Sequence, residues 1–158
     1  MSERGEVSAW RLVKRAYAES AFDGEGSFRF GGRWNSRGFR MVYVSSTLSL
    51  AALEFLVHLD AAFAVPRQVA FPLRIPPGLV EAFAPGGGSS PARGLPDLSE
   101  SRSVGDRWIR EARSAALAVP SAIIPQEINF LLNPAHPDFS KIGIGPAEAF
   151  AFDKRLVP

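Results

Sequence analysis

The sequence contains no cysteine, and this absence excludes two kinds of site. Neither a disulfide framework nor a cysteine-based zinc site can form without thiols, and a chain without cysteine fits a reducing compartment. Histidine is also scarce, since His58 and His136 are the only two, and they lack the close paired spacing of metal ligands. We therefore expect a protein that works without a metal ion.

Strong net charge and long apolar segments are missing as well. The 18 basic and 16 acidic residues leave a net charge of +2, which does not indicate a nucleic-acid-binding protein. No apolar run approaches the roughly 20 residues of a membrane-spanning helix. The polar residues 1–6 do not resemble a signal peptide. We expect a cytoplasmic protein that binds neither nucleic acid nor a membrane.

The sequence does contain a set of short apolar segments that predict an α+β fold. Hydrophobic residues make up 46% of the chain, enough for the core of one domain over residues 1–158. Strands are expected over 9–15, 41–44, 67–75, 118–124, 129–133 and 150–152, and helices over 48–59 and 103–117. Pro72 predicts that its strand lies at an edge or carries a bulge. The glycine-rich residues 22–32 predict a loop or a bulged hairpin, and residues 86–101 predict a mobile surface loop.

The segment Gly31-Gly32-Arg33-Trp34-Asn35 is the first candidate for a binding site. Glycines let the backbone approach a ligand closely, and a guanidinium can bind phosphate or carboxylate through two parallel hydrogen bonds. Arg33 could therefore bind an anion, although a loop arginine paired with a surface acid fits the same pattern. Arg11, which follows Trp10 on the first expected strand, is a second candidate, with a solvated strand end as its alternative.

Tyr43 and Glu54 are unusual for their surroundings. Tyr43 stands in an aliphatic strand, where its ring could stack on a heterocyclic ligand or pack in the core with a satisfied hydroxyl. Glu54 is the only acid over residues 41–59 and lies on an apolar helix. A carboxylate there is costly unless it is paired or used, so it is either catalytic or half of an ion pair, for example with Arg33. A half metal site formed with His58 is a weaker alternative.

Two polar residues later in the chain complete the set of candidates. Ser121 lies between Pro120 and the aliphatic residues 122–124, where its hydroxyl could donate to a ligand or belong to a simple turn. No Gly-x-Ser-x-Gly pattern surrounds it, so the sequence does not predict a hydrolase nucleophile. Asn129 is a candidate cofactor-binding residue, and it could brace the site by hydrogen bonding to the backbone.

The order of these motifs resembles the RES-domain family, bacterial toxins named for an arginine, a glutamate and a serine. The resemblance covers about residues 10–156. It rests on Trp10-Arg11, Gly24-Glu25-Gly26, Gly31-Gly32-Arg33-Trp34-Asn35, Tyr43-Val44-Ser45, Ala51-Ala52-Leu53-Glu54, Val119-Pro120-Ser121, Glu127-x-Asn129, Asn133-Pro134-x-His136-Pro137 and Phe152-Asp153-x-Arg155-Leu156. It implies that Arg33, Glu54 and Ser121 are the naming residues. It also implies a fold like that of ADP-ribosyltransferase toxins, with a split β-core and NAD bound in a cleft.

The resemblance further implies a substrate and a partner. Family members consume NAD+ by hydrolysis or phosphorolysis, at least one type modifies a protein instead, and an Xre-type antitoxin is usually encoded beside them. The implied function is a toxin that cleaves the nicotinamide–ribose bond of NAD+ and depletes it, with ADP-ribosylation of a host protein as the alternative. A non-catalytic binding module fits the isolated Glu54 less well, and an RNA-cleaving toxin fits the near-neutral charge less well.

On this hypothesis each candidate residue has a role. Glu54 stabilises an oxocarbenium-like ribosyl cation, and no strong general acid is needed because nicotinamide leaves as a neutral molecule. Arg33, together with Arg11, would bind the pyrophosphate, and Tyr43 would stack on nicotinamide. Ser121 would hydrogen-bond the ribose or the amide.

Overall fold

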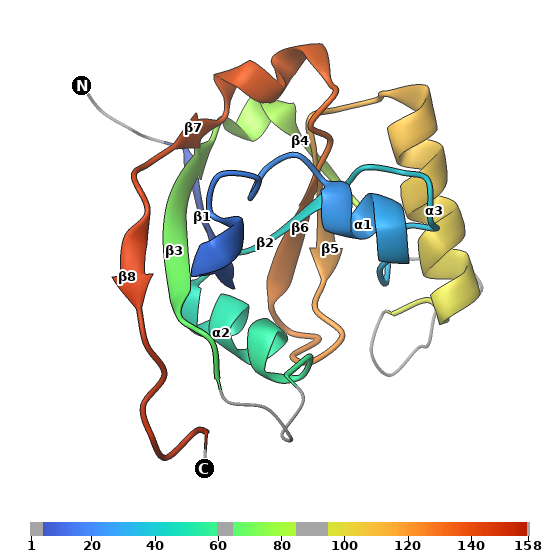
Figure 1. The fold of residues 1–158 in the computed structure, drawn as a ribbon. Coiled ribbons are helices and arrows are strands. Elements are labelled where there is room, and N and C mark those ends of the chain that lie inside the picture. Colours follow the sequence, from blue (N-terminus) through green and yellow to red (C-terminus); the bar gives the residue numbers. More distant parts are fainter. Residues whose placement is uncertain (1–4, 60–64, 85–94, 158) are drawn as a thin grey trace.

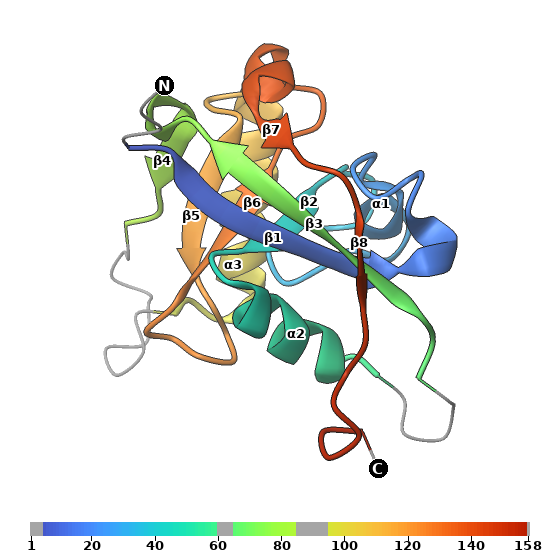
Figure 2. The ribbon, with the colours of Figure 1, turned by 90° about the vertical axis from the view of Figure 1, so that its left-hand side faces the viewer.

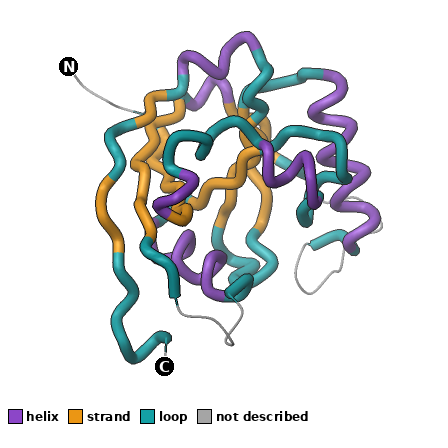
Figure 3. The backbone as a smooth tube through the Cα atoms, in the orientation of Figure 1, coloured by secondary structure: helices purple, strands orange, loops and turns teal. Residues whose placement is uncertain are grey.

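A computed structural model of the chain describes residues 5–59, 65–84 and 95–157, which form one mixed sheet with helices beside it (Figure 1; Figure 3). The strands are β1 (Val7–Lys14), β2 (Val42–Ser45), β3 (Gln68–Ile75), β4 (Val80–Ala82), β5 (Ala116–Pro120), β6 (Ile128–Leu132), β7 (Gly143–Ile144) and β8 (Glu148–Phe150). The α-helices are α1 (Glu25–Phe30), α2 (Leu48–Leu56) and α3 (Leu98–Glu111), and short 3-10 helices cover Arg15–Tyr17, Pro77–Leu79 and Pro137–Lys141. This is the α+β class predicted from the sequence. Within the described residues, none of the helices combines the length and apolar character needed to cross a membrane.

The strands of the described residues form a curled sheet in the order β4-β5-β6-β2-β1-β3-β7, with β8 also paired to β3. All pairings are antiparallel except that of β4 with β5. Figure 2 shows β1 and β3 lying across the direction of β5 and β6. The sheet therefore turns strongly along its width, as the right-handed twist of strands favours.

The sheet is split where β2 meets β1. β2 pairs with β6 through each of its residues, but with β1 only at the pair Trp10–Ser45. The side chain of Arg11 crosses the split, because its Nε donates to the carbonyl of Ala21 and its Nη1 donates to the carbonyl of Tyr43 at 2.9 Å. The guanidinium thus supplies a donor to a β2 carbonyl where the backbone ladder is interrupted.

Helices α2 and α3 cover the same face of the sheet. Ala51 of α2 packs with Leu12 of β1, and Trp108 of α3 packs with Leu117 of β5. The strand register places Leu12 and Leu117 on one face. The buried core on the opposite face includes Ala9, Val42, Val44, Leu73, Ile75, Ala116, Phe130 and Leu132. Of the candidate residues, Tyr43, Glu54, Ser121 and Asn129 lie on this covered side.

Both of these helices begin at a capping residue. Thr47 and Asp97 each accept a hydrogen bond from the backbone N–H three residues later, at 3.1 and 2.8 Å. The cap at Asp97 corrects the predicted loop over 86–101, because α3 already begins at Leu98. Residues 86–94 of that predicted loop lie outside the described residues.

Residues 22–32 contain helix α1, and the predicted loop or hairpin there is wrong. Gly24 and Gly31 flank the helix with φ values of 73° and 71°, which glycine adopts without steric cost. Between them, Glu25 pairs with Arg29 one turn later at 2.8 Å. The glycines therefore begin and end a short helix.

The prediction for Pro72 is wrong in one respect, because β3 is not at an edge. It pairs with β1 on one side and with β7 and β8 on the other. β8 pairs with residues 68–70 and β7 with residues 73–74, so Pro72 falls in the interval between these two short strands. On that side a proline interrupts no ladder hydrogen bond.

Candidate active site

Glu54 on α2 is the centre of a hydrogen-bonded cluster that joins distant parts of the chain. Its Oε1 accepts a hydrogen bond from Ser121 Oγ at 2.8 Å and another from Asn129 Nδ2 at 2.7 Å. The side chain is half-buried, and its Oε2 has no hydrogen-bond donor within the described residues. The sequence left open an ion pair between Glu54 and Arg33. The described residues do not form this pair.

Ser121 lies just past the end of β5 and is fully buried. Its oxygen accepts the backbone N–H groups of Ile123 and Ile124, both at 3.0 Å, while its O–H donates to Glu54. A hydroxyl offers one donor and two acceptor positions, so all three are occupied. This geometry favours a positioning role for Ser121 over the direct ligand contact predicted from the sequence.

Asn129 is held by a side chain of β2. Its Oδ1 accepts a hydrogen bond from Ser45 Oγ at 2.7 Å, and this bond turns the amide so that its NH₂ faces Glu54. Ser45 is only 4% exposed, and sequence reasoning missed it. The available signal was its position two residues after Tyr43 on the same strand, which places both side chains on one face.

The hydroxyl of Tyr43 holds the loop that carries Arg33. It donates to Asn35 Oδ1 at 2.6 Å and accepts the backbone N–H of Trp34 at 3.0 Å. Burial raises the pKa of this hydroxyl well above its ordinary value of 10.0, while the hydrogen bond from Trp34 acts in the opposite direction. Gly32 is needed beside it, because a Cβ there would lie 2.6 Å from the Tyr43 hydroxyl oxygen.

Arg33 is half-buried and only partly satisfied by the protein. Its Nη2 donates to the carbonyl of Pro96 at 3.3 Å, and its Nε is buried without an acceptor among the described residues. A buried donor without a partner costs about 1–3 kcal/mol, and more for a charged group. An anion bound beside the guanidinium would remove this cost.

The structure does not bring Arg11 together with the other candidates. The register pairs Trp10 with Ser45, so the neighbouring Arg11 points to the face of the sheet opposite Glu54. Its guanidinium is occupied by the two carbonyl bonds that cross the split in the sheet. Burial lowers the pKa of Arg11 to about 10, and the charge of Asp23 partly opposes this shift.

Histidine takes no part in the cluster. His58 follows Glu54 by one helical turn, but it is exposed, and its Nδ1 lies 2.8 Å from the backbone oxygen of Glu54. Within the part of the chain that the structure describes, no three His, Cys, Asp or Glu side chains converge as metal ligands would. The groups that meet the Glu54 carboxylate are neutral hydrogen-bond donors.

Comparison with known proteins identifies the family. The RES domain matches residues 8–153. The chain belongs to the RES domain family. This RES-domain protein is 34% identical over 149 residues to the Toxin Res of Yersinia enterocolitica, which covers 93% of this chain and 97% of the relative. It is also 34% identical over 156 residues to the Prs ADP-ribosylating toxin of a Sphingobium species, covering 96% of this chain and 97% of the relative.

The fold of this RES-domain protein is similar to that of a chain in a solved structure. That structure is the crystal structure of the M. tuberculosis MbcT-MbcA toxin-antitoxin complex, with a TM-score of 0.71. The match covers 92% of this chain and 85% of the other, at 16% sequence identity. At that identity the similarity concerns the fold, and it confirms the fold class that the sequence predicted.

Proposed function

We propose that this protein is the toxin of a bacterial toxin–antitoxin pair and that it cleaves the nicotinamide–ribose bond of NAD+, which depletes the cell of NAD+. The arrangement at Glu54 carries the proposal, since Ser121 and Asn129 hold one carboxylate oxygen and leave the other available to a ligand. The toxin names of its relatives support it. The toxin–antitoxin complex of similar fold supports a protein antitoxin as the partner. That this antitoxin is of the Xre type is part of the proposal and follows from the resemblance to the family.

The chemistry of this cleavage suits a single fixed carboxylate. The bond between the ribose carbon and the nicotinamide nitrogen breaks, and both electrons leave with nicotinamide, which departs as a neutral molecule. The ribose carbon becomes oxocarbenium-like, and the negative charge of Glu54 stabilises this developing positive charge. A water oxygen then bonds to the carbon and releases a proton to solvent, which gives ADP-ribose.

The remaining residues would bind NAD+ or support the residues that do. The Nε of Arg33, which lacks an acceptor among the described residues, suits an oxygen of the pyrophosphate. The ring of Tyr43 lies on the same face of β2 as Ser45 and would stack on nicotinamide. Arg11 would support the fold, because its guanidinium is bonded to carbonyls on the other face.

The substitution Glu54→Gln tests this proposal, because it keeps the shape of the side chain and removes its charge. We expect the purified variant to consume NAD+ about 100-fold more slowly or worse, the usual effect of losing a group that stabilises charge in the transition state. Glu148→Gln, which changes an exposed acid on β8, is the matched control and should keep the wild-type rate. Chromatography measures the rate at which NAD+ disappears. If the Glu54→Gln variant consumes NAD+ at the wild-type rate, the proposal is wrong.

Transfer of ADP-ribose to a protein is the second candidate, and the name of the Sphingobium relative favours it. Both reactions share the cleavage step and differ only in the group that attacks the ribose carbon. Incubation with labelled NAD+ and a bacterial lysate separates them: label on a protein band indicates transfer, and free ADP-ribose indicates hydrolysis. A requirement for inorganic phosphate would indicate phosphorolysis.

A further inference from the structure

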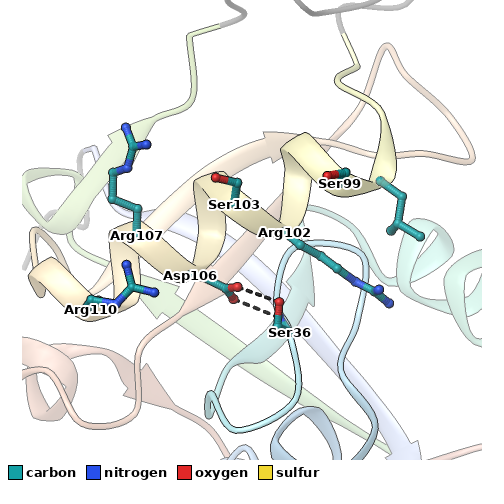
Figure 4. Close-up of a pocket in the computed structure, with 8 residues that line it drawn as sticks. Ser36, Ser99, Arg102, Ser103, Asp106, Arg107 and Arg110 are labelled. Carbon is teal, nitrogen blue, oxygen red and sulfur yellow. Dashed lines mark hydrogen bonds between the residues drawn. The ribbon is translucent and has the colours of Figure 1, made fainter.

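A hollow of about 660 Å³ lies on the outer face of α3, and no member of the Glu54 cluster lines it (Figure 4). It is lined by Ser36, Leu98, Ser99, Arg102, Ser103, Asp106, Arg107 and Arg110. The α3 residues among these recur at intervals of three and four, so they form one stripe along the helix. The volume falls within the range of roughly 300–1,000 Å³ that small-molecule sites occupy.

Three arginines of this stripe form no ion pair with an acid of the described residues. Arg102 donates from Nε to the carbonyl of Gly32 at 2.9 Å, which leaves its terminal nitrogens available. Arg110 lies 5.5 Å from the ring centre of Phe39, and Arg107 has no hydrogen bond within the described residues. The three guanidinium groups of the hollow therefore outnumber its one lining carboxylate, that of Asp106.

Asp106 stands in the middle of the stripe and does not pair with these arginines. It lies four residues after Arg102 and four before Arg110, the spacing at which ion pairs form on a helix. Its carboxylate instead turns to Ser36, accepting the backbone N–H at 2.8 Å and the hydroxyl at 2.6 Å. Figure 4 shows both bonds lying between the side chains of Arg102 and Arg110, while Arg107 extends from the other side of the same helix.

We propose that this hollow is a second anion site, distinct from the Glu54 cluster, and that it binds a small phosphate-bearing molecule. Guanidinium groups bind phosphate oxygens through paired hydrogen bonds, and the arginines of the stripe supply several such donors. The hydroxyls of Ser99 and Ser103 line the same hollow and add neutral donors. The arginines lie close together on one helix and repel one another, and the negative charge of a bound phosphate would reduce this repulsion.

The hollow adjoins the loop that carries Arg33. Arg102 bonds to the carbonyl of Gly32 and Asp106 bonds to Ser36, so α3 holds the loop on both sides of Arg33. Since Arg33 is itself the proposed pyrophosphate contact of NAD+, a binding experiment has to separate the two sites.

Titration with inorganic phosphate and with pyrophosphate, followed by calorimetry at low ionic strength, tests the proposal. We expect saturable binding of at least one of them, weakened tenfold or more (about 1.4 kcal/mol) in the double variant Arg107→Gln/Arg110→Gln. The control is Arg29→Gln/Arg155→Gln, which removes the same charge at exposed positions elsewhere and should bind as the wild type does. All four side chains are exposed, and unchanged unfolding temperatures confirm that the variants fold.

Three outcomes would overturn the proposal. The first is no saturable binding of either anion to the wild-type protein. The second is an equal loss of binding in both double variants, which would show attraction to the overall charge. The third is binding that Arg33→Ala abolishes and Arg107→Gln/Arg110→Gln leaves intact, which would place the anion at Arg33.

Discussion

Around Glu54, neighbouring side chains hold one another in position. Ser121 gives its only proton to the carboxylate, while two backbone N–H groups occupy the remaining positions of its oxygen. Ser45 acts one step further away, because it fixes the amide of Asn129 that donates to Glu54. Loss of either serine is therefore expected to disturb the position of the carboxylate before it disturbs the binding of a ligand.

The variant Ser121→Ala separates these two effects. We expect kcat for NAD+ cleavage to fall about tenfold or more, because a misplaced catalytic group loses much of its effect, while KM stays unchanged. The free energy of unfolding should also fall by about 1–3 kcal/mol, since the N–H groups of the half-buried Ile123 and Ile124 lose their acceptor. Ser140→Ala, at an exposed position of the 3-10 helix Pro137–Lys141, is the control for both measurements. A higher KM at unchanged kcat would show that Ser121 contacts the ligand directly.

Ionisation of Tyr43 is expected to weaken the fold only at alkaline pH. Because burial raises the pKa of the hydroxyl in the folded state above its ordinary value of 10.0, the stability that depends on the neutral hydroxyl is complete below about pH 10. It is lost as the pH rises further. The difference in unfolding free energy between wild type and Tyr43→Phe should thus stay constant up to about pH 10 and shrink above it. Chemical denaturation at a series of pH values checks this, and a difference that shrinks near neutral pH would contradict it.

The sequence singles out a residue most clearly where that residue breaks its local pattern. Glu54 is an acid on an apolar helix, and Arg33 stands between glycines and a tryptophan, so both could be selected without a structure. Ser45 gives a weaker signal, because its spacing from Tyr43 places it on the same face, but only the pairing of β2 with β6 sets it opposite Asn129. The saturated bonding of Ser121 likewise depends on a turn whose shape no local pattern predicts.

At the scale of secondary-structure elements, α3 fixes the loop that carries Arg33. Arg102 bonds to the loop before Arg33, and Asp106 bonds to Ser36 after it. Gly105 lies between these two contacts on the helix, where its backbone approaches the loop so closely that a side chain does not fit. The helix thus sets the position of the guanidinium that is proposed to bind pyrophosphate.

The variant Gly105→Ala tests this contact. An added Cβ would lie 1.7 Å from the carbonyl oxygen of Trp34, so the helix and the loop must move apart. Overpacking of this kind costs about 1–3 kcal/mol or more, which exceeds the gain of roughly 1 kcal/mol in helix propensity. We expect a lower free energy of unfolding and a higher KM for NAD+. Gly26→Ala is the matched control, because no atom lies within 4 Å of a Cβ there and the same gain in helix propensity applies.

The elements that the sequence predicted are those with a repeated apolar pattern. The strands expected around residues 41–44, 67–75 and 129–133 occur with ends shifted by only one residue. β4 and β7 were not predicted, because strands of three and two residues are too short to show alternation. Helix α1 was missed because glycines at both of its ends resemble a loop, whereas contacts within the folded chain make it a helix.

In the whole molecule, the candidate site depends on segments that are distant in the sequence. The partners of Glu54 lie 67 and 75 residues further along the chain, and they meet it only when α2 has packed against the sheet. The same face of the sheet carries α3 and the loop with Arg33. The two sides of the split sheet must therefore be joined before these residues can act together, and Arg11 adds a side-chain hydrogen bond where β1 and β2 share only one backbone pair.

The variant Arg11→Lys distinguishes this joining role from the anion clamp that the sequence suggested. Lysine keeps the charge but lacks the planar fork that reaches the carbonyls of Ala21 and Tyr43 together. We expect the free energy of unfolding to fall by about 1–3 kcal/mol, with KM for NAD+ unchanged, because the side chain points away from the face that carries Glu54. Arg15→Lys makes the same substitution at an exposed position and should change neither quantity. A raised KM at unchanged stability would return Arg11 to the pyrophosphate site, because only contact with the substrate would then account for it.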